Sequence, residues 1–518
     1  MKTILAIIAV FAPTTLAAAP PKADYLCPAG GQRGQKVELT VGGLDGPAEA
    51  WASHPGISVS AGKKTGQFHV AIAPDVSCGM HWLRFFNKDG AAAVRPFLVN
   101  QIPEVMEQEP NDEPKKPQEI KETPVIVNGR LEKPSDTDVF AVSLKKGQTL
   151  VAAVEAHRLL RSPMDAVLQV LSEDGFILAQ NDDFYDIDPL VAFPVPRDGR
   201  YLVRIFCFPA VADARVGLHG KENCVYRLTL TTGPFIDHAW PLTVERAKPG
   251  AVELIGWNIP ADKGKTGVVP ATDDDLAFVQ PSGFANGTLV RVEPHACVTE
   301  GPLHPPVTVS GRLKGDKSVS LDLQTKKGQR LRFQIESREL FFPLDPVLIL
   351  RDAAGKQLQR VQAAKLNADP VLDFTPSADA KHTLEVRDLH EEGGPRHLFR
   401  LRCLVPQPDF EATLATDRFT TAPGKPLEIN VDINRLGGLK EPIELVAEGL
   451  GEVKQEQLES KDAKKAGLRL SGLKAPQNAP FRLYARIKGR EETRRAVTAT
   501  LADLDSRTPH LWLTVSGK

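Results

Sequence analysis

Short apolar runs separated by turn residues occupy most of this chain of 518 residues. Segments such as Val125–Leu131, Val139–Leu144 and Thr149–Val154 alternate or run apolar for the length of one strand,. Gly147 and the Asp174–Gly175 pair mark the turns between such segments,. Gly (40) and Pro (42) together exceed their usual share of about 12%,. Long capped helical patterns are hard to find, so the sequence predicts an all-β fold of tandem β-sandwich modules with few helices.

The first 19 or so residues have the three parts of a secretory signal. Lys2 provides a positive start, Ile4–Phe11 form an apolar run, and Ala17–Ala19 are small residues suited to cleavage. A retained membrane anchor is the alternative, but a spanning helix needs roughly 20 apolar residues and this run is shorter. The sequence predicts an exported protein, secreted, periplasmic or held at the cell surface, with no membrane span after the signal is removed.

Six cysteines are present, and six cysteines allow 15 pairings,. If every pair stays inside one predicted domain, the bonds are Cys27–Cys78, Cys207–Cys224 and Cys297–Cys403. An exported compartment permits disulfides, and buried free thiols are the alternative. No two cysteines have C-x-x-C spacing, so the sequence gives little support to a structural zinc site.

Residues 107–231 carry a series of short motifs. In order these include E-x-E-P-N-D (Glu107–Asp112), V-N-G-R-L (Val127–Leu131), D-T-D-V-F (Asp136–Phe140), K-K-G-Q (Lys145–Gln148) and V-Y-R-L (Val225–Leu228). The segment resembles a bacterial pre-peptidase C-terminal domain, an extracellular β-sandwich of jelly-roll-like type found on secreted enzymes and surface proteins. The resemblance implies an extracellular module and names no reaction.

The same motifs recur further along the chain. V-S-G-R-L (Val309–Leu313) repeats V-N-G-R-L, and K-K-G-Q-R-L (Lys326–Leu331) repeats K-K-G-Q-T-L. D-P-V-L-D-F (Asp369–Phe374) corresponds to D-P-L-V-A-F, and F-R-L-R (Phe399–Arg402) corresponds to Y-R-L-T. We therefore expect a second, diverged copy of the same sandwich.

The predicted organisation has a signal and five β-sandwich domains. These are residues 1–19 (signal), 20–101 (immunoglobulin-like), 102–232 (pre-peptidase C-terminal-like), 233–296 (short immunoglobulin-like), 297–405 (the diverged copy) and 406–518 (C-terminal immunoglobulin-like).

Acidic residues at the entrance of the first copy form the best candidate site. Hard oxygen ligands on a linker and a nearby loop suit calcium, which takes 6–8 oxygens. The domain is also similar to bacterial collagen-binding domains, in which an acidic linker and a facing loop bind calcium. That similarity implies a metal site at Glu107, Glu109, Asn111, Asp136 and Asp138. The alternative is a solvated linker beside a strand end, and the second copy lacks the acidic residues.

No enzyme motif is apparent: the chain lacks G-x-S-x-G, H-E-x-x-H, G-x-x-x-x-G-K-[ST] and a dinucleotide fingerprint,. Charge is balanced, with 64 Lys and Arg against 65 Asp and Glu, so nothing favours nucleic acid,. The sequence predicts a non-catalytic exported protein for adhesion, surface architecture or binding of an extracellular protein or polysaccharide. The first alternative is an accessory or processing module of a secreted hydrolase or peptidase system. A hydrolase with its site at a domain junction is the second alternative, because triad residues need not be close in sequence.

Overall fold

The computed structural model describes residues 19–211, 217–248, 250–270, 275–315, 318–365, 368–459, 462–474 and 477–516. In these ranges the regular structure is almost entirely strand, and the one α-helix, α1 (His157–Leu160), has a single turn. The strands form ten sheets that stack in pairs around separate apolar cores, which confirms the predicted tandem β-sandwich fold. The predicted signal falls almost wholly outside the described residues. No described helix is long and apolar enough to cross a bilayer.

Module 1 packs the sheet β1-β3-β6-β5 on the sheet β2-β9-β7-β4. Inward-facing residues alternate along β6, where Phe68, Val70 and Ile72 are buried, as expected of a strand with one solvated face,. The strands are β1 (Tyr25–Cys27), β2 (Gly30–Gln32), β3 (Lys36–Gly42), β4 (Glu49–Ala52), β5 (Ile57–Ala61), β6 (Gln67–Ile72), β7 (Gly79–Asn87), β8 (Gly90–Ala91) and β9 (Arg95–Asn100).

Module 2 packs the sheet β10-β12-β19-β14-β17 on the sheet β11-β13-β18-β15-β16. Its core lies between them and includes Val127, Phe140 and Leu228. The strands are β10 (Glu104–Met106), β11 (Gln118–Ile120), β12 (Val125–Arg130), β13 (Asp138–Leu144), β14 (Thr149–Glu155), β15 (Met164–Ser172), β16 (Ile177–Asn181), β17 (Leu190–Pro194), β18 (Gly199–Pro209) and β19 (Val225–Thr231).

Module 4 repeats this topology, with the sheet β26-β27-β34-β29-β32 on the sheet β28-β33-β30-β31. An edge strand equivalent to β11 is reduced there to one parallel bridge between Leu303 and Leu323. The elements are β26 (Ala296–Val298), β27 (Val307–Arg312), β28 (Ser318–Thr325), β29 (Leu331–Glu336), the 3-10 turn η2 (Arg338–Leu340), β30 (Pro346–Asp352), β31 (Gln357–Gln362), β32 (Val371–Phe374), β33 (Ala380–Asp388) and β34 (Leu398–Leu404).

The repeated Asp-Pro pair has the same structural role in both copies. The Asp188 carboxylate accepts backbone N–H bonds from Ala156, His157 and Arg158 at the start of α1, at 2.7–3.1 Å. Asp369 does the same at the start of η2, for Ser337, Arg338 and Glu339. A carboxylate at this position satisfies donors that have no partner within the turn itself, so these two aspartates stabilise the fold.

Modules 3 and 5 complete the chain. Module 3 packs β20-β22-β23 on β21-β25-β24, and module 5 packs β39-β40-β37-β35-β43-β44 on β36-β45-β41-β38. The elements of module 3 are β20 (Phe235–Trp240), β21 (Thr243–Glu245), β22 (Ala251–Trp257), η1 (Ala261–Lys263), β23 (Lys265–Gly267), β24 (Leu276–Val279) and β25 (Thr288–Glu293). Those of module 5 are β35 (Asp409–Leu414), β36 (Arg418–Thr421), β37 (Leu427–Leu436), β38 (Ile443–Glu448), β39 (Lys454–Leu458), β40 (Lys465–Ser471), β41 (Gln477–Ile487), η3 (Glu491–Thr493), β42 (Arg495–Ala496), β43 (Thr498–Leu501), β44 (Ser506–Thr508) and β45 (Leu511–Val515).

Buried arginines tie modules 2 and 4 to the segments that precede them. Arg227 of β19 bonds Glu104 at 2.7 Å and the Asn128 side chain at 2.9 Å. Its guanidinium also covers Gly30 of module 1, where a Cβ would lie 2.1 Å from Nη1, so only glycine allows this approach. Arg400, at the matching position of β34, pairs with Glu293 at the end of module 3. Each buried arginine therefore holds its module against the module that precedes it in the chain.

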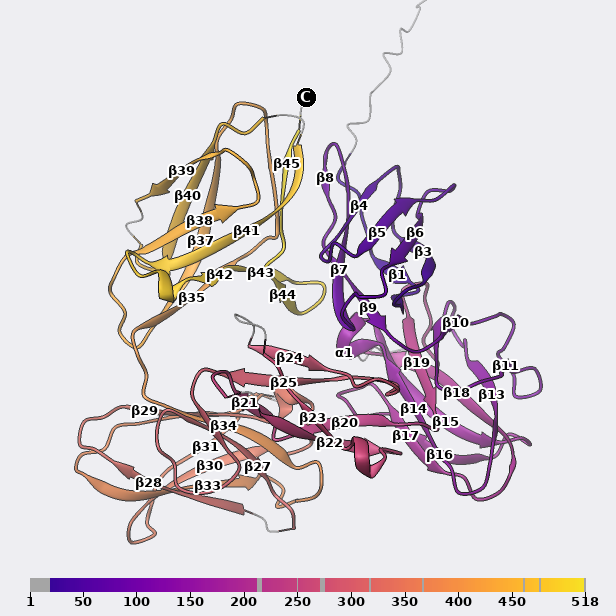
Figure 1. Ribbon diagram of the computed structural model, residues 1–518, viewed down its shortest axis with the longest axis horizontal. Coiled ribbons are helices and arrows are strands. Elements are labelled where there is room, and N and C mark those ends of the chain that lie inside the picture. Colours follow the sequence, from indigo (N-terminus) through magenta and orange to yellow (C-terminus); the bar gives the residue numbers. More distant parts are fainter. Residues whose placement is uncertain are drawn as a thin grey trace, which may run out of the picture.

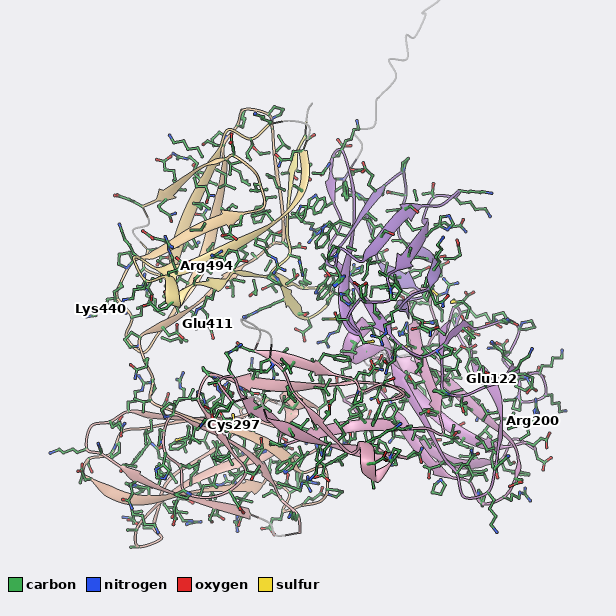
Figure 2. The ribbon with its side chains drawn as sticks, in the orientation of Figure 1. Glu122, Arg200, Cys297, Glu411, Lys440 and Arg494 are labelled. Atoms are coloured by element: carbon green, nitrogen blue, oxygen red, sulfur yellow. The ribbon has the colours of Figure 1, made fainter. Side chains whose placement is uncertain are left out.

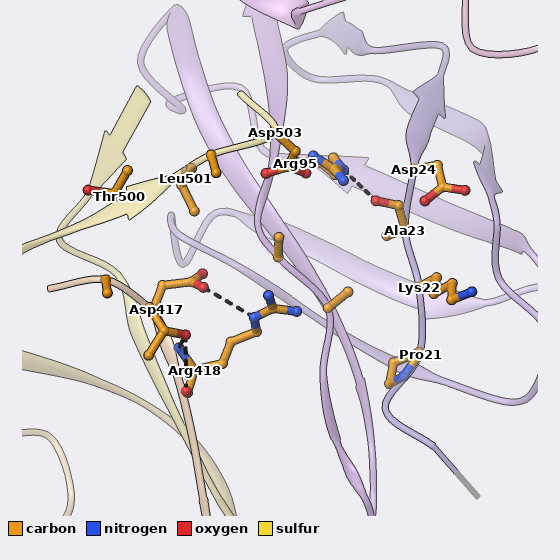
Figure 3. A pocket seen from close by; sticks show the side chains of 15 residues that line it. Pro21, Lys22, Ala23, Asp24, Arg95, Asp417, Arg418, Thr500, Leu501 and Asp503 are labelled. Carbon is orange, nitrogen blue, oxygen red and sulfur yellow. Dashed lines mark hydrogen bonds and ion pairs between the residues drawn. The ribbon is translucent and has the colours of Figure 1, made fainter. Parts of the chain in front are cut away.

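The chain closes on itself, because module 5 returns to lie beside module 1 (Figure 1). Arg84 of β7 has no exposed surface and bonds the Asp417 carboxylate at 2.7 Å and the His510 carbonyl at 2.9 Å. Arg95 pairs with Asp503 at 2.6 Å at the rim of the same seam (Figure 3). Modules 1 and 5 therefore meet through a buried ion pair, with a second, partly exposed ion pair at the edge.

The structure contains no bond between any of the six cysteines, so the three predicted disulfides are not shown. The pairing Cys297–Cys403 is wrong. Cys297 is in register with Thr308, and Thr308 with Arg402, which puts Cys297 and Cys403 two strands apart, about 9–10 Å,. Cys403 also points into the core of module 4, whereas Cys297 lies at the junction with module 3 (Figure 2). Side chains on opposite faces at that separation cannot be bridged.

Cys207 and Cys224 are adjacent, and we expect them to form a disulfide in an oxidising compartment. Their thiols hydrogen bond each other, which raises the pKa of Cys207 and lowers that of Cys224. Closing a loop of this length stabilises a fold by about 3 kcal/mol. Reduction is expected to lower the melting temperature of the wild type, and Cys224→Ser to abolish that difference. Alkylation with mass analysis checks the bond, and the matched control Cys297→Ser should behave like the wild type.

Candidate metal centre

The acidic residues lie where the chain crosses from one sheet of module 2 to the other. β10 pairs in parallel with β12, and β11 pairs in parallel with β13. The connection between β10 and β11 therefore passes over the open end of the sandwich, next to the start of β13. Two hydrogen bonds hold it there: the Val139 N–H donates to the Asn111 carbonyl (3.0 Å), and the Thr137 hydroxyl donates to the Asp112 carbonyl (2.8 Å).

Glu109, Asp112 and Asp136 form an outer group whose carboxylate oxygens lie within 4.8 Å of one another. Asp136 is fully buried and Glu109 is exposed, so the group runs from the surface inward. Lys133 is the nearby cation, with Nζ 3.6 Å from both Asp112 and Asp136. Burial and the neighbouring carboxylates raise the pKa of Asp136.

Several buried polar atoms on and beside this segment have no hydrogen-bond partner among the described residues. Asn111 has no exposed surface, and neither its Oδ1 nor its Nδ2 has a hydrogen-bond partner among the described residues. The Oδ1 atoms of Asp112 and Asp136 likewise accept no hydrogen bond there. Buried polar atoms are normally paired, since an unpaired one costs about 1–3 kcal/mol. Unpaired oxygens of this kind fit a hard cation with a flexible, all-oxygen coordination shell, as calcium requires.

Glu107, Asp138 and Tyr226 form a second, inner group. The Tyr226 hydroxyl lies 2.6 Å from Asp138 Oδ2 and 3.1 Å from Glu107 Oε2. One hydroxyl proton serves only one of these oxygens, so the two carboxyl groups share a further proton when no cation balances them. Burial raises the pKa of Glu107 to about 7, and burial and Glu107 raise the pKa of Asp138 well above its usual value.

Gly129 gives the inner group its space. A Cβ on Gly129 would lie 2.3 Å from both Glu107 Oε2 and the Tyr226 hydroxyl. In module 4 the equivalent glycine, Gly311, is covered in the same way by Phe399. A glycine covered by an aromatic ring is therefore a structural feature common to both modules. The tyrosine hydroxyl and the carboxylates occur in module 2 alone.

The structure divides four of the five residues predicted as ligands between the two groups. Glu109 and Asp136 lie in the outer group, and Glu107 and Asp138 lie beside Tyr226 in the inner group. Asn111 lies on the same connecting segment, with its side chain buried and without a described partner. Sequence reasoning did not include Asp112 among the ligands, although it is the next residue after Asn111 in the same acidic motif. It also missed Tyr226, whose only signal was the replacement of tyrosine by phenylalanine in the second copy.

No family model matches the chain, so the resemblance to the pre-peptidase C-terminal domain stays an expectation. A probable subtilase-type serine protease of Deinococcus radiodurans is 33% identical over 73 residues, which are 14% of this chain and 10% of the protease. The chain thus matches about a tenth of the length of this relative.

Two solved structures resemble the chain loosely. One is SGBP-B of the Bacteroides ovatus mixed-linkage glucan utilization locus with a bound heptasaccharide (9% identity, 74% of each chain, TM-score 0.15). The other is immunoglobulin domains 1–4 of Sidekick-1 (10% identity, 97% of each chain, TM-score 0.22). At scores this low, the function has to be argued from the residues of this chain.

Proposed function

We propose that this chain is an exported, non-catalytic binding protein with a calcium site in module 2. The observation that carries the proposal is the convergence of the Glu109, Asp112 and Asp136 carboxylates on a segment that also carries Asn111, whose fully buried side-chain amide has no described partner.

Calcium suits this group better than zinc or magnesium. The side chains that converge are carboxylates, without histidine or thiol ligands, which argues against zinc,. They lie on a connecting segment and a loop, and such an adaptable frame suits calcium better than the strict octahedron of magnesium. A bound ion would fix the 107–112 segment to the start of β13, and with it the approach of module 1, which enters through β10.

The surroundings of two histidines that lie beside hydroxyl groups are consistent with this non-catalytic proposal. His295 bonds the Thr308 hydroxyl at 2.9 Å, and His382 bonds the Thr325 hydroxyl at 3.1 Å. A hydroxyl beside a histidine is the arrangement of an activated nucleophile. Thr308 is completely buried, however, and Thr325 is only 3% exposed, so a substrate has no access to either.

Binding to immobilised extracellular proteins and polysaccharides, with calcium or with a chelator, tests this function. We expect the wild type to retain a protein or polysaccharide ligand in calcium, and Asp136→Asn to retain less of it. Turnover of a protease or glycosidase substrate that one point substitution abolishes would contradict the non-catalytic proposal.

The 73-residue match to a subtilase-type protease supports a second candidate function, that of an accessory or processing module of a secreted peptidase system. In that case the chain should change the maturation rate or the kcat/KM of a secreted subtilase added in equal amount. An unchanged protease, together with retention of a polymer, would decide for the first candidate.

A further inference from the structure

A cavity of about 250 Å³ lies where modules 2, 3 and 4 meet, lined in part by residues of β14, β20 and β25. Asn100 of module 1 borders it as well. Junctions between domains are common places for small-molecule sites, which usually measure about 300–1,000 Å³. A cavity of this size therefore suits a ligand of about one ring. Most of its wall is apolar, including Leu159, Phe235, Phe278, Leu289 and Phe341.

Three large apolar side chains on the outer face of module 3 lead into the cavity. Leu276 is 38% exposed, Phe278 41% and Leu289 58%. They share a face, because Phe278 and Leu289 are direct cross-strand partners and Leu276 lies two residues before Phe278,. A contiguous exposed apolar surface beside a cavity marks a binding site more often than a fold requirement.

One buried nitrogen atom in this wall, Nε2 of His238, has no described hydrogen-bond partner. His238 is 4% exposed, and its Nδ1 lies 2.9 Å from the Asp237 carboxylate. Asp237 also accepts hydrogen bonds from the Tyr185 hydroxyl (2.8 Å) and from Arg396 (3.2 Å). Burial opposes ionisation of Asp237, but the bond from His238 and the charge of Arg396 hold its pKa below the usual value. The Asp237 carboxylate holds Nδ1 of His238, and Nε2 of His238 has no described partner, so this nitrogen is free to hydrogen bond a ligand,.

The charged groups around the cavity balance once Arg396, the ion-pair partner of Asp237, is included. Arg158 and Arg291 are the basic residues of the wall, and Glu155, Glu339 and Asp237 are the acidic ones. Arg158 lies 3.6 Å from Glu155. Arg291 lies within the field of Glu336 and Glu339. A balanced rim gives no advantage to an ion, so it favours a neutral ligand.

We propose that this cavity binds a neutral hydroxylated aromatic ring of the phenol type. The ring would pack on Phe278, Leu289 and the neighbouring apolar wall, in the edge or offset contacts that aromatic pairs prefer. Its hydroxyl would donate a hydrogen bond to Nε2 of His238. The ring could belong to a free phenolic compound or to a tyrosyl side chain. The site is separate from the calcium centre and does not depend on it.

Titration with p-cresol tests the proposal on the full chain. Calorimetry is expected to give a Kd below about 1 mM, a reasonable affinity for so small a ligand. Toluene lacks the hydroxyl and should bind at least about tenfold more weakly. The Nε2 nitrogen resonance of His238 should shift with p-cresol and stay in place with toluene. N-acetyltyrosinamide separates the two sources, since tighter binding than p-cresol indicates a tyrosyl group and weaker binding a free phenol.

Phe278→Ala is the variant of choice, because its side chain is partly exposed and its loss should leave the fold intact. The substitution should raise the Kd of p-cresol at least fivefold. The matched control is Phe176→Ala, which removes an exposed ring (71%) on the β15–β16 turn of module 2, outside the cavity. Equal binding of toluene and p-cresol, stronger binding of methyl β-glucoside, unchanged binding in Phe278→Ala, or no binding of p-cresol would each overturn the proposal.

Discussion

Asp417→Ala is expected to open the closed chain and to lower its stability by about 3–5 kcal/mol. The substitution leaves the Arg84 guanidinium, which has no exposed surface, without its carboxylate partner. Burial already lowers the pKa of Arg84, so the unpaired charge is costly where it stands. Separation of modules 1 and 5 relieves that cost by exposing the guanidinium to water. Small-angle scattering should show a larger radius of gyration, and denaturant unfolding a lower free energy.

The matched control is Asp503→Ala, which removes the partner of Arg95 in the same seam. Asp503 has a side chain that is 48% exposed, and pairs of this kind contribute about 0–1 kcal/mol,. Its radius of gyration should equal that of the wild type. If the two variants have the same stability, or if Asp417→Ala stays as compact as the wild type, the buried pair does not close the chain.

Without calcium, the stability of module 2 is expected to fall as the pH rises from about 4.5 to 7. The pKa of Glu107 is raised from 4.5 to about 7 in the folded protein, so the folded state binds the proton more tightly than the unfolded state. The protonated Glu107 therefore contributes its full stabilisation below the pKa that it has in the unfolded state. This contribution is lost as the pH rises through the pKa that Glu107 has in the folded state. For Glu107 the loss is roughly 3 kcal/mol, and the raised pKa of Asp138 acts in the same direction,.

Calcium is expected to offset most of this loss at neutral pH. A cation held by Glu109, Asp112 and Asp136 favours the ionised forms of the neighbouring Glu107 and Asp138, and at a concentration 100 times its Kd it stabilises the fold by about 2.7 kcal/mol,. Thermal melts between pH 4.5 and 8, with calcium or chelator, measure both effects. Asp136→Asn should lose the calcium response, while Asp174→Asn, in an exposed turn of the same module, should keep it. A melting temperature that rises with pH in chelator would contradict the proton sharing of Glu107 and Asp138.

The sandwich fold could be predicted because its signals are local. Alternation along β6 and turns at Gly147 and Gly175 depend only on neighbouring residues,. The internal repeat added more, because residues kept in both copies, such as Asp188 and Asp369, turned out to hold backbone donors in the fold.

The closure of the chain could not be predicted, since Arg84 and Asp417 are 333 residues apart and neither has a distinctive motif. The pairing of Cys297 with Cys403 was wrong for a related reason: sequence order does not show which face of a sheet a residue occupies. The candidate metal site could be predicted only in part. Its linker residues were visible as an acidic motif, but the division into outer and inner groups depends on where the 107–112 segment crosses the sandwich.

Direct titration of calcium into the calcium-free chain, by calorimetry with metal analysis, tests the central claim. The wild type is expected to bind one ion per chain, Asp136→Asn none, and Asp322→Asn, an exposed carboxylate of module 4, one. Absence of binding in the wild type, or full binding in Asp136→Asn, would contradict a calcium site at Glu109, Asp112 and Asp136.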